Sequence, residues 1–227
     1  MRPASGVPAH SFWARLTDAE REELRLAAIP VRYSTDQPIM RQGAVERHLV
    51  VILSGSAKVI KVIEQGIEKM LGLCGPGSVL GELAALTAAP RSATVIALEP
   101  VHGLLIEANR FAGAAERRPS LRVQLERVLA ERLLQADERR AEGSMPRAFH
   151  RLAALLADLA DNLASAAHQP VVLRISQPEL ASLASTSVAT AARFVGRLKD
   201  LGLVRTGRRR IVVVDTEELR RQADSED

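Results

Sequence analysis

The sequence predicts an α+β fold made of three parts in chain order. Between residues 31 and 106, short apolar runs such as HLVVILSGSAKVIKVI alternate with turn residues, which indicates a small β-barrel or sandwich. Residues 121–142 then repeat apolar side chains every three or four positions without a breaker, which predicts one long helix. Helical patterns and a hairpin pattern resume after residue 146 and predict a smaller C-terminal unit.

The composition is that of a globular protein with enough residues for two hydrophobic cores. The chain has 227 residues, of which 47% are hydrophobic and 26% are charged, and its net charge is +4. No apolar run reaches the length of a membrane span, and the N-terminal MRPASGVPAHSFWARL lacks the apolar centre of a signal peptide, so we expect a cytoplasmic location. Aromatic residues amount to 3%, which argues against single-strand binding by base stacking.

The chemistry-bearing side chains argue against a metal centre, a redox cofactor and an enzyme. Cys74 is the single cysteine, which excludes an internal disulfide and a cysteine-built metal or iron–sulfur cluster. His48 and His102 lie in or near strand patterns, and we interpret them as structural residues rather than haem ligands. No nucleophile and base stand together, so we expect no metal, haem or iron–sulfur cluster and no catalytic activity.

Local signals define the elements of the N-terminal half. Thr17 is a candidate N-cap for an amphipathic helix at residues 18–28. Gln65-Gly66 is the turn of a candidate hairpin within the strand region. Asn109 is expected to cap a short helix, and Pro119-Ser120 opens the long one.

The apolar stripe of the long helix admits two interpretations. The stripe consists of Leu121, Leu125, Val128, Leu129 and Leu133. Such a helix can pair with the same helix of a second chain, or it can pack on its own barrel. Because it ends in the breaker segment 143–146 rather than folding back, we favour a parallel two-chain pair and interpret that segment as a hinge.

The C-terminal region carries the pattern of a helix-turn-helix. A helix is predicted at residues 147–164 and a strand at 171–175. Ser176 and Glu179 form a capping box that starts the next helix, and Ser187 can cap a second helix after a tight turn. The N-terminal part of that second helix would enter the major groove of DNA. A hairpin with the basic tip RTGRRR follows and would lie along the phosphates as a wing.

Outward-facing residues of the second helix are candidates for reading DNA. Arg193 is the best candidate for a guanine contact and Arg197 for a phosphate contact. Val188 and Ala189 offer only apolar contacts, for example with a thymine methyl. The full candidate set includes both helix starts and the wing: Ser176, Gln177, Ser187, Val188, Ala189, Thr190, Arg193, Arg197, Arg208 and Arg209.

The segment GELAALTAAPRSATVIA, at residues 81–97, has the residue types of a sugar-phosphate clamp. Glu82 and Arg91 stand on either side of a short helical turn. A carboxylate accepts hydrogen bonds from ribose hydroxyls, and a guanidinium pairs with a phosphate in a fork of charge-assisted bonds. The alternative is that Glu82 and Arg91 pair with one another across an empty pocket.

The order of these motifs resembles the CRP/FNR family of bacterial transcription regulators. The resemblance covers nearly the whole chain and rests on QGAVERHLVVILSGSAKV, GPGSVLGEL, PRSATVIA, the long helix and a hairpin ending in IVVVD. It implies a homodimer with double-stranded DNA and RNA polymerase as partners. It also implies a cyclic-nucleotide-binding-type barrel at residues 1–118, a dimerisation helix at 119–142, a hinge at 143–146 and a winged helix-turn-helix at 147–227.

The resemblance also implies a ligand site. In family members that bind cyclic AMP, the positions of Glu82, Arg91 and Ser92 hold the ribose and the cyclic phosphate, and the position of Arg132 contacts the ligand from the long helix. The candidate ligand residues are therefore Gly81, Glu82, Leu83, Ala84, Arg91, Ser92, Ala93, Arg132, Ala136 and Asp137.

Two departures from the cyclic AMP pattern bear on specificity. Where the cyclic AMP receptor uses a Thr-Ser pair on adenine, this chain has Ala136-Asp137. An ionised Asp137 can accept from the adenine amino group, but it matches the two adjacent donors of guanine better, so cyclic GMP and cyclic di-GMP join cyclic AMP as candidates. The alternative is that Asp137 is a solvated helix residue. In the reading helix, an Arg-Glu pair is replaced by Val188-Ala189, which predicts a different operator.

The favoured function is that of a homodimeric DNA-binding transcription regulator controlled by a cyclic nucleotide. One alternative is a ligand-independent DNA-binding regulator with an empty or differently used barrel. Another is a nucleotide-binding subunit that acts on a protein partner, against which the basic wing argues.

Overall fold

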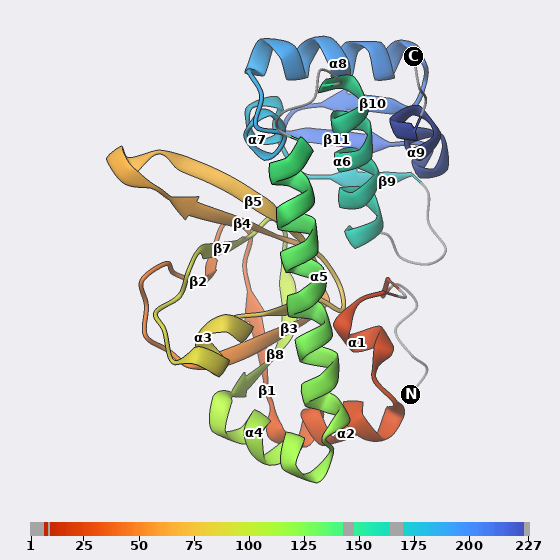
Figure 1. The fold of residues 1–227 in the computed structure, drawn as a ribbon. Coiled ribbons are helices and arrows are strands. Elements are labelled where there is room, and N and C mark those ends of the chain that lie inside the picture. The colour runs from red at the N-terminus through yellow and green to blue at the C-terminus, as the bar shows by residue number, and fades with distance from the viewer. Residues whose placement is uncertain (1–6, 9, 143–147, 164–169, 225–227) are drawn as a thin grey trace.

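The computed structural model describes residues 7–8, 10–142, 148–163 and 170–224, with the backbone alone at 135–136, 138–142, 148 and 224. These residues form an N-terminal β-barrel, a long helix α5 (Ser120–Glu142) beside it and a C-terminal unit of helices around a small sheet (Figure 1). The predicted α+β class is therefore confirmed. The predicted hinge, 143–146, lies outside the described residues.

Two antiparallel four-stranded sheets build the barrel. The first has the order β1-β8-β3-β6, formed by β1 (Ile29–Tyr33), β8 (Val101–Glu107), β3 (His48–Ser54) and β6 (Val79–Leu80). The second has the order β2-β7-β4-β5, formed by β2 (Pro38–Met40), β7 (Thr94–Ala97), β4 (Ala57–Val62) and β5 (Glu68–Cys74). The predicted strand region is confirmed.

Strand β3 explains why its sequence is apolar without alternation. Leu49 and Val51 pack into a core shared with the N-terminal helices and α5, whereas Val50 and Ile52 pack into the barrel interior. All four side chains are at most 1% exposed, because successive residues of a strand face opposite sides and both sides here are covered.

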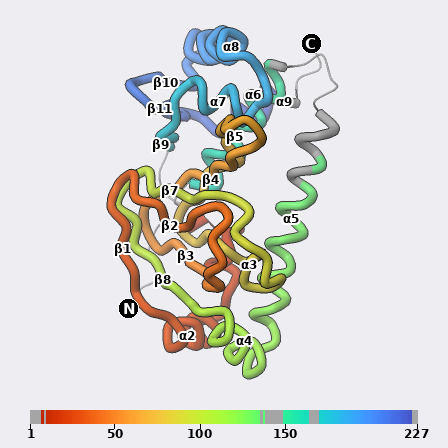
Figure 2. The backbone as a smooth tube through the Cα atoms, turned by 90° about the vertical axis from the view of Figure 1, so that its left-hand side faces the viewer, coloured from red at the N-terminus to blue at the C-terminus, as the bar shows by residue number. Residues whose placement is uncertain are grey.

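The hairpin between β4 and β5 turns where the sequence predicts it. A short 3-10 turn, η1 (Glu64–Gly66), joins the strands, with positive φ angles of 68° at Gln65 and 76° at Gly66. Glycine adopts such a conformation without steric cost, which suits the second position of this turn. The hairpin reaches the C-terminal unit in Figure 2.

Two short helices, α2 (Asp18–Ala27) and α4 (Ala108–Arg117), cover one end of the barrel, and α1 (Phe12–Arg15) lies beside α5 (Figure 1). A further helix, α3 (Glu82–Thr87), follows β6. Thr17 and Glu20 form a capping box at α2, as predicted for Thr17. The prediction for Asn109 is wrong: α4 begins at Ala108 with Glu107 at its N-cap, two residues before the predicted cap, and the Asn109 side chain accepts from the adjacent Arg110 N–H at 2.7 Å.

The apolar stripe of α5 packs mainly on its own chain. Leu121 and Leu125 are fully buried in the core shared with the barrel, and Val128 is partly buried against it. Each fully buried leucine stabilises this packing by roughly 1.5–3 kcal/mol. The prediction that these residues form the seam with a second chain is therefore wrong for Leu121 and Leu125. Leu133, the last residue of the stripe, is not covered by its own chain and is 60% exposed.

The C-terminal unit confirms the predicted order of helices and hairpin. It comprises α6 (Ala148–Leu163), β9 (Val171–Leu173), α7 (Gln177–Leu183), α8 (Val188–Asp200), β10 (Val204–Gly207), β11 (Arg210–Val213) and α9 (Thr216–Asp224). The sheet has the order β10-β11-β9. Strand β9 ends at Leu173, two residues earlier than predicted. Ile175 lies beyond the end of the strand and is nevertheless buried.

The barrel and the C-terminal unit share packing and polar contacts. Met70 and Leu73 of β5 belong to the same hydrophobic core as the α6 side chains. The Lys58 Nζ atom lies 2.5 Å from Glu179 Oε1, and the Met70 N–H donates to Ser182 Oγ at 3.1 Å. Helix α7 therefore lies against the β4–β5 hairpin (Figure 2). Within the described residues, no helix combines the length and apolar character that a bilayer span requires.

Candidate functional site

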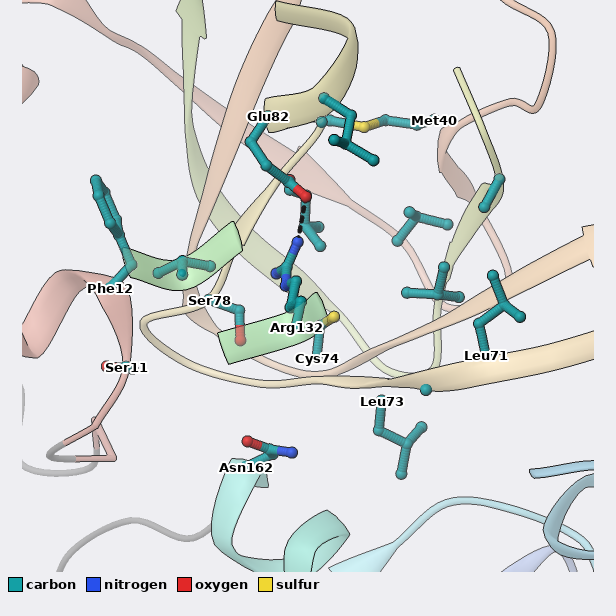
Figure 3. Close-up of a pocket in the computed structure, with 18 of the residues that line it drawn as sticks. Ser11, Phe12, Met40, Leu71, Leu73, Cys74, Ser78, Glu82, Arg132 and Asn162 are labelled. Atoms are coloured by element: carbon teal, nitrogen blue, oxygen red, sulfur yellow. Dashed lines mark hydrogen bonds and ion pairs between the residues drawn. The ribbon is translucent and has the colours of Figure 1, made fainter. Parts of the chain in front are cut away.

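A cavity of about 520 Å³ lies between the barrel, α5, the N-terminal segment and α6 (Figure 3). Small-ligand sites usually measure ~300–1,000 Å³, so the cavity has the size of a binding site. Glu82, Arg91 and Ser92 line it from the segment after β6, and Arg132 lines it from α5. Apolar side chains of the second sheet contribute a further wall, formed by Met40, Val59, Leu71, Leu73 and Val95.

Glu82 is held as a buried carboxylate at the start of α3. Its side chain is 6% exposed and forms an ion pair with the Arg132 guanidinium (Figure 3). Arg132 Nη2 also donates to the Val79 carbonyl at 2.8 Å. Burial alone lowers the pKa of Arg132, but the Glu82 carboxylate outweighs burial and the pKa is raised. Arg132 thereby ties α5 to the barrel at the cavity.

Arg91 is buried at 4% exposure and bonds to backbone rather than to Glu82. Its Nη1 donates to the Gly81 carbonyl at 2.9 Å and its Nη2 to the His48 carbonyl at 2.8 Å. The alternative that Glu82 and Arg91 pair with one another is therefore wrong. Burial is the main cause that lowers the pKa of Arg91, and nearby carboxylates of Glu46, Glu82 and Glu107 oppose it.

An unpartnered donor of Arg91 fits an anionic ligand, and Gly81 allows Arg91 its position. The Arg91 Nε atom is buried, and no hydrogen-bond acceptor in the described part of the chain reaches it, so a donor is left over beside the cavity. Gly81 has φ of 80°, and a Cβ atom there would lie 2.3 Å from Arg91 Nη1. Only glycine therefore allows the guanidinium to approach this turn so closely.

The structure brings most of the predicted ligand residues together. Eight of them line the cavity: Gly81, Glu82, Leu83, Ala84, Arg91, Ser92, Ala93 and Arg132. The side chain of Ala136 lies outside what the structure describes. Asp137 is exposed on α5 and is not among the residues that line the cavity of one chain.

Several lining residues come from segments that sequence reasoning did not connect. Ser11, Ser78 and Asn162 contribute polar groups, and His10 Nε2 lies 3.4 Å from Asn162 Oδ1 across 152 positions of sequence. Cys74 is buried and also lines the cavity, and burial raises the pKa of its thiol. No local pattern could have indicated these contacts. Among the described residues, no three His, Cys, Asp or Glu side chains are grouped as a metal site requires.

The second helix of the predicted helix-turn-helix presents the expected side chains outward. Ser187 caps α8 by accepting from the Thr190 N–H at 3.1 Å. Val188, Ala189, Arg193 and Arg197 are exposed, and Thr190 is half-buried. The Arg193 and Arg197 guanidinium groups lie over the rings of Phe194 and Phe149, at 5.2 Å and 4.3 Å from the centroids. Aromatic contact thus orients both arginines on the protein surface.

The start of α7 and the tip of the β10–β11 hairpin complete this surface. Ser176 and Glu179 form the predicted capping box, and Gln177 is the first residue of α7. Arg208 and Arg209 are exposed at the hairpin tip. Burial alone raises the pKa of Glu179, but hydrogen bonds from Lys58 and Ser176 outweigh it and hold the pKa below its usual range. Glu179 is therefore an anion shared between the capping box and the barrel.

Comparison with known proteins assigns both parts of the chain to families. Residues 30–118 match the model of the cyclic nucleotide-binding domain, and residues 150–222 match the model of the Crp-like helix-turn-helix domain. The first match spans nearly all of the barrel strands and the segment after β6. The second spans most of the C-terminal unit, from within α6 to within α9.

Similar proteins span most of the chain. A cyclic AMP receptor protein of Thermus thermophilus is 32% identical over 77% of this chain and 79% of that protein. A CRP-like cAMP-activated global transcriptional regulator of Mycobacterium tuberculosis is 25% identical over 86% and 88%. The crystal structure of a CRP/FNR family transcriptional regulator from Thermus thermophilus is 25% identical, covers 88% and 100%, and has a TM-score of 0.68. The chain therefore belongs to the CRP/FNR family of DNA-binding transcription regulators and combines a cyclic nucleotide-binding domain with a Crp-like helix-turn-helix domain.

Proposed function

We propose that the protein is a homodimeric transcription regulator whose affinity for DNA is controlled by a cyclic nucleotide bound in the cavity. The observation that carries this proposal is the convergence of Glu82, Arg91, Ser92 and Arg132 on one cavity. Arg91 and Ser92 would hold the cyclic phosphate with a guanidinium and a hydroxyl donor, and Glu82 would accept from the ribose hydroxyl.

The tie between Glu82 and Arg132 suggests how the ligand acts on α5. A ribose hydroxyl that donates to Glu82 competes with the Arg132 guanidinium or joins it on the same carboxylate. Either change alters the link between the barrel and the long helix that leads to the DNA-binding domain. The ligand shifts the equilibrium only to the extent that it binds one arrangement more tightly.

A second face of α5 supports the homodimer. Val123, Arg127, Ala130 and Leu134 are exposed and follow steps of four and three residues, the spacing of a coiled-coil seam. Asp137 continues the series three residues after Leu134. In a dimer Asp137 would lie beside the partner helix, where it remains a candidate for reading a guanine base.

The relatives bear on the choice of nucleotide. Both the Thermus and the Mycobacterium proteins are named for cyclic AMP. Cyclic AMP is therefore the first candidate, and cyclic GMP and cyclic di-GMP remain candidates through Asp137.

A specific observation favours a second candidate function, ligand-independent DNA binding. Arg91 already has two backbone acceptors, and Glu82 already has Arg132 as a partner. The polar groups of the cavity are thus largely satisfied within the chain, as a barrel that works without a ligand would require.

The remaining features of the proposal follow from the DNA-binding domain. Arg193 would read a guanine in the major groove, with the α7 start and the wing arginines on phosphates. RNA polymerase as a partner, a cytoplasmic location and the absence of enzymatic activity are proposed with the same function. The domain division at residues 118, 142 and 146 is also a proposal.

Calorimetric titration of the full chain with cyclic AMP, cyclic GMP and cyclic di-GMP tests the ligand. Ser92→Glu places a carboxylate at an exposed cavity position and should weaken binding of the phosphate roughly tenfold or more through charge repulsion. Ser92→Gln is the matched control, since it adds similar bulk without charge. Binding of no nucleotide, together with tight operator binding by the ligand-free chain, would leave the second function standing.

A further inference from the structure

We propose that Asn162, in the first helix of the helix-turn-helix domain, contacts the base of the nucleotide bound in the same chain. The inference rests on the proposed function, because it concerns the ligand of that cavity. Asn162 and Leu159 bring α6 into the cavity wall. In Figure 3, Asn162 and Glu82 lie at opposite sides of the cavity, with Arg132 and Ser78 between them.

The distribution of polar groups in the cavity matches a nucleotide with its base toward α6. Glu82 lies on one side of the cavity (Figure 3), and Arg91 bonds there to the carbonyl of Gly81, the residue before Glu82. A base has apolar faces and a polar edge, and the second sheet supplies apolar side chains such as Leu71 and Leu73. The edge then needs a hydrogen-bonding group at the far side, where Asn162 offers both an acceptor oxygen and N–H donors.

Asn162 is held in place by the contact between α6 and the barrel. A Cβ atom at Gly75 would lie 2.7 Å from the Asn162 carbonyl oxygen, so the end of α6 sits directly on the turn after β5. His10 contacts the side-chain oxygen of Asn162 at 3.4 Å. An amide positioned by its neighbours before the ligand arrives loses less entropy when the ligand binds.

The amide favours adenine over guanine. Adenine presents the N6 donor beside the N7 acceptor, the edge to which asparagine bonds with both of its groups. On the corresponding edge guanine presents two acceptors, O6 and N7, so an amide can satisfy only one of them well. Asn162 and Asp137 therefore make opposite predictions: adenine read by Asn162 within one chain, or guanine read by Asp137.

A contact at Asn162 gives the ligand direct access to the DNA-binding domain. A nucleotide that touches Glu82 on the barrel and Asn162 on α6 binds the docked arrangement more tightly than an arrangement in which α6 has moved away. Docking and ligand binding then stabilise each other by the same factor.

Calorimetry with four full-length proteins tests this inference. Asn162→Ala should weaken cyclic AMP binding by roughly 5- to 150-fold, the effect of losing a bidentate amide–base pair. Asn162→Asp keeps the size but loses the donors, and should weaken binding as well. His10→Ala removes the side chain that contacts Asn162, and with it a part of the cavity wall, and should weaken binding less than Asn162→Ala does. Asn109→Ala, at an exposed position on α4, is the control for asparagine removal.

A second ligand separates base contact from a structural effect. The cyclic phosphate of purine riboside lacks the 6-amino group, so Asn162→Ala should cost less binding affinity with this ligand than with cyclic AMP. An equal loss for both ligands, or unchanged cyclic AMP affinity in the Asn162 variants, overturns the inference while the wild type still binds. If the wild type binds no cyclic nucleotide, the proposed function itself fails.

Discussion

Replacing Gly75 with alanine should loosen the contact between the barrel and the DNA-binding domain. Gly75 has no positive φ, and its Cβ would lie 2.7 Å from both the Asn162 carbonyl oxygen and Leu163 Cδ2. The end of α6 must move by about 0.7 Å to reach 3.4 Å, where ordinary van der Waals contact begins. Since backbone blocks one side, the clash is not relieved by turning a side chain.

The expected cost is about 1–3 kcal/mol, the usual range for overpacking a well-packed site. For a chain of this size each kcal/mol lowers the melting temperature by ~2–4 °C, which scanning calorimetry resolves. Amide exchange at the end of α6 should accelerate in the same variant, because that segment loses its support.

Gly113→Ala is the matched control. Its Cβ would meet only Arg117 Nη1 at 3.6 Å within α4, an ordinary contact. Alanine is a better helix former than glycine by roughly 1 kcal/mol, so this variant should melt at a higher temperature than the wild type. If Gly75→Ala melts at or above the wild-type temperature with unchanged exchange at α6, the docking contact described above is refuted.

Leu125→Ala should lower the free energy of unfolding by about 2–5 kcal/mol in urea titrations. Leu134→Ala, on the exposed face of α5, should instead shift the sedimentation of the protein toward monomers. Monomers from Leu125→Ala and a large loss of stability from Leu134→Ala would contradict the two faces of the helix. Burial, aided by the Arg91 charge and opposed by nearby glutamates, lowers the pKa of His48 below 6.5, so the folded chain favours the neutral ring. Melting temperatures should therefore fall as the pH drops below about 6.5, and less so in His48→Gln; equal slopes would count against this reasoning. Burial raises the pKa of Cys74, so a thiol reagent at neutral pH should react slowly with the folded chain. The reaction should be slower still with cyclic AMP bound, because Cys74 lines the cavity. A reaction rate equal to that of the chain unfolded in urea would show that the thiol is accessible.

Local interactions explain why much of the fold could be predicted. The capping boxes at Thr17 and Ser176 each join groups three residues apart, so the sequence displays both partners together. The hairpin at Gln65-Gly66 and the two helices of the reading motif likewise depend on short-range turn and periodicity signals. The prediction of an N-cap at Asn109 failed because the short Asn109 side chain accepts from the next backbone N–H, which is a competing local contact.

The long helix shows how periodicity alone leaves a partner undetermined. The spacing of Leu121 and Leu125 predicts a buried face but does not say whether the same chain or a second one covers it. The fold decides, because the barrel and α1 lie against that face and leave Val123 and Leu134 exposed.

The sequence by itself determined the order of elements, the family and which residue types gather at the sugar-phosphate motif. Only the tertiary structure decided which arginine pairs with Glu82, since Arg91 and Arg132 carry the same charge and differ in where the folded chain places them. It also decided that His10 and Asn162, 152 positions apart, meet at one cavity. Such contacts depend on how sheets and helices pack across the whole chain, and no run of neighbouring residues encodes them.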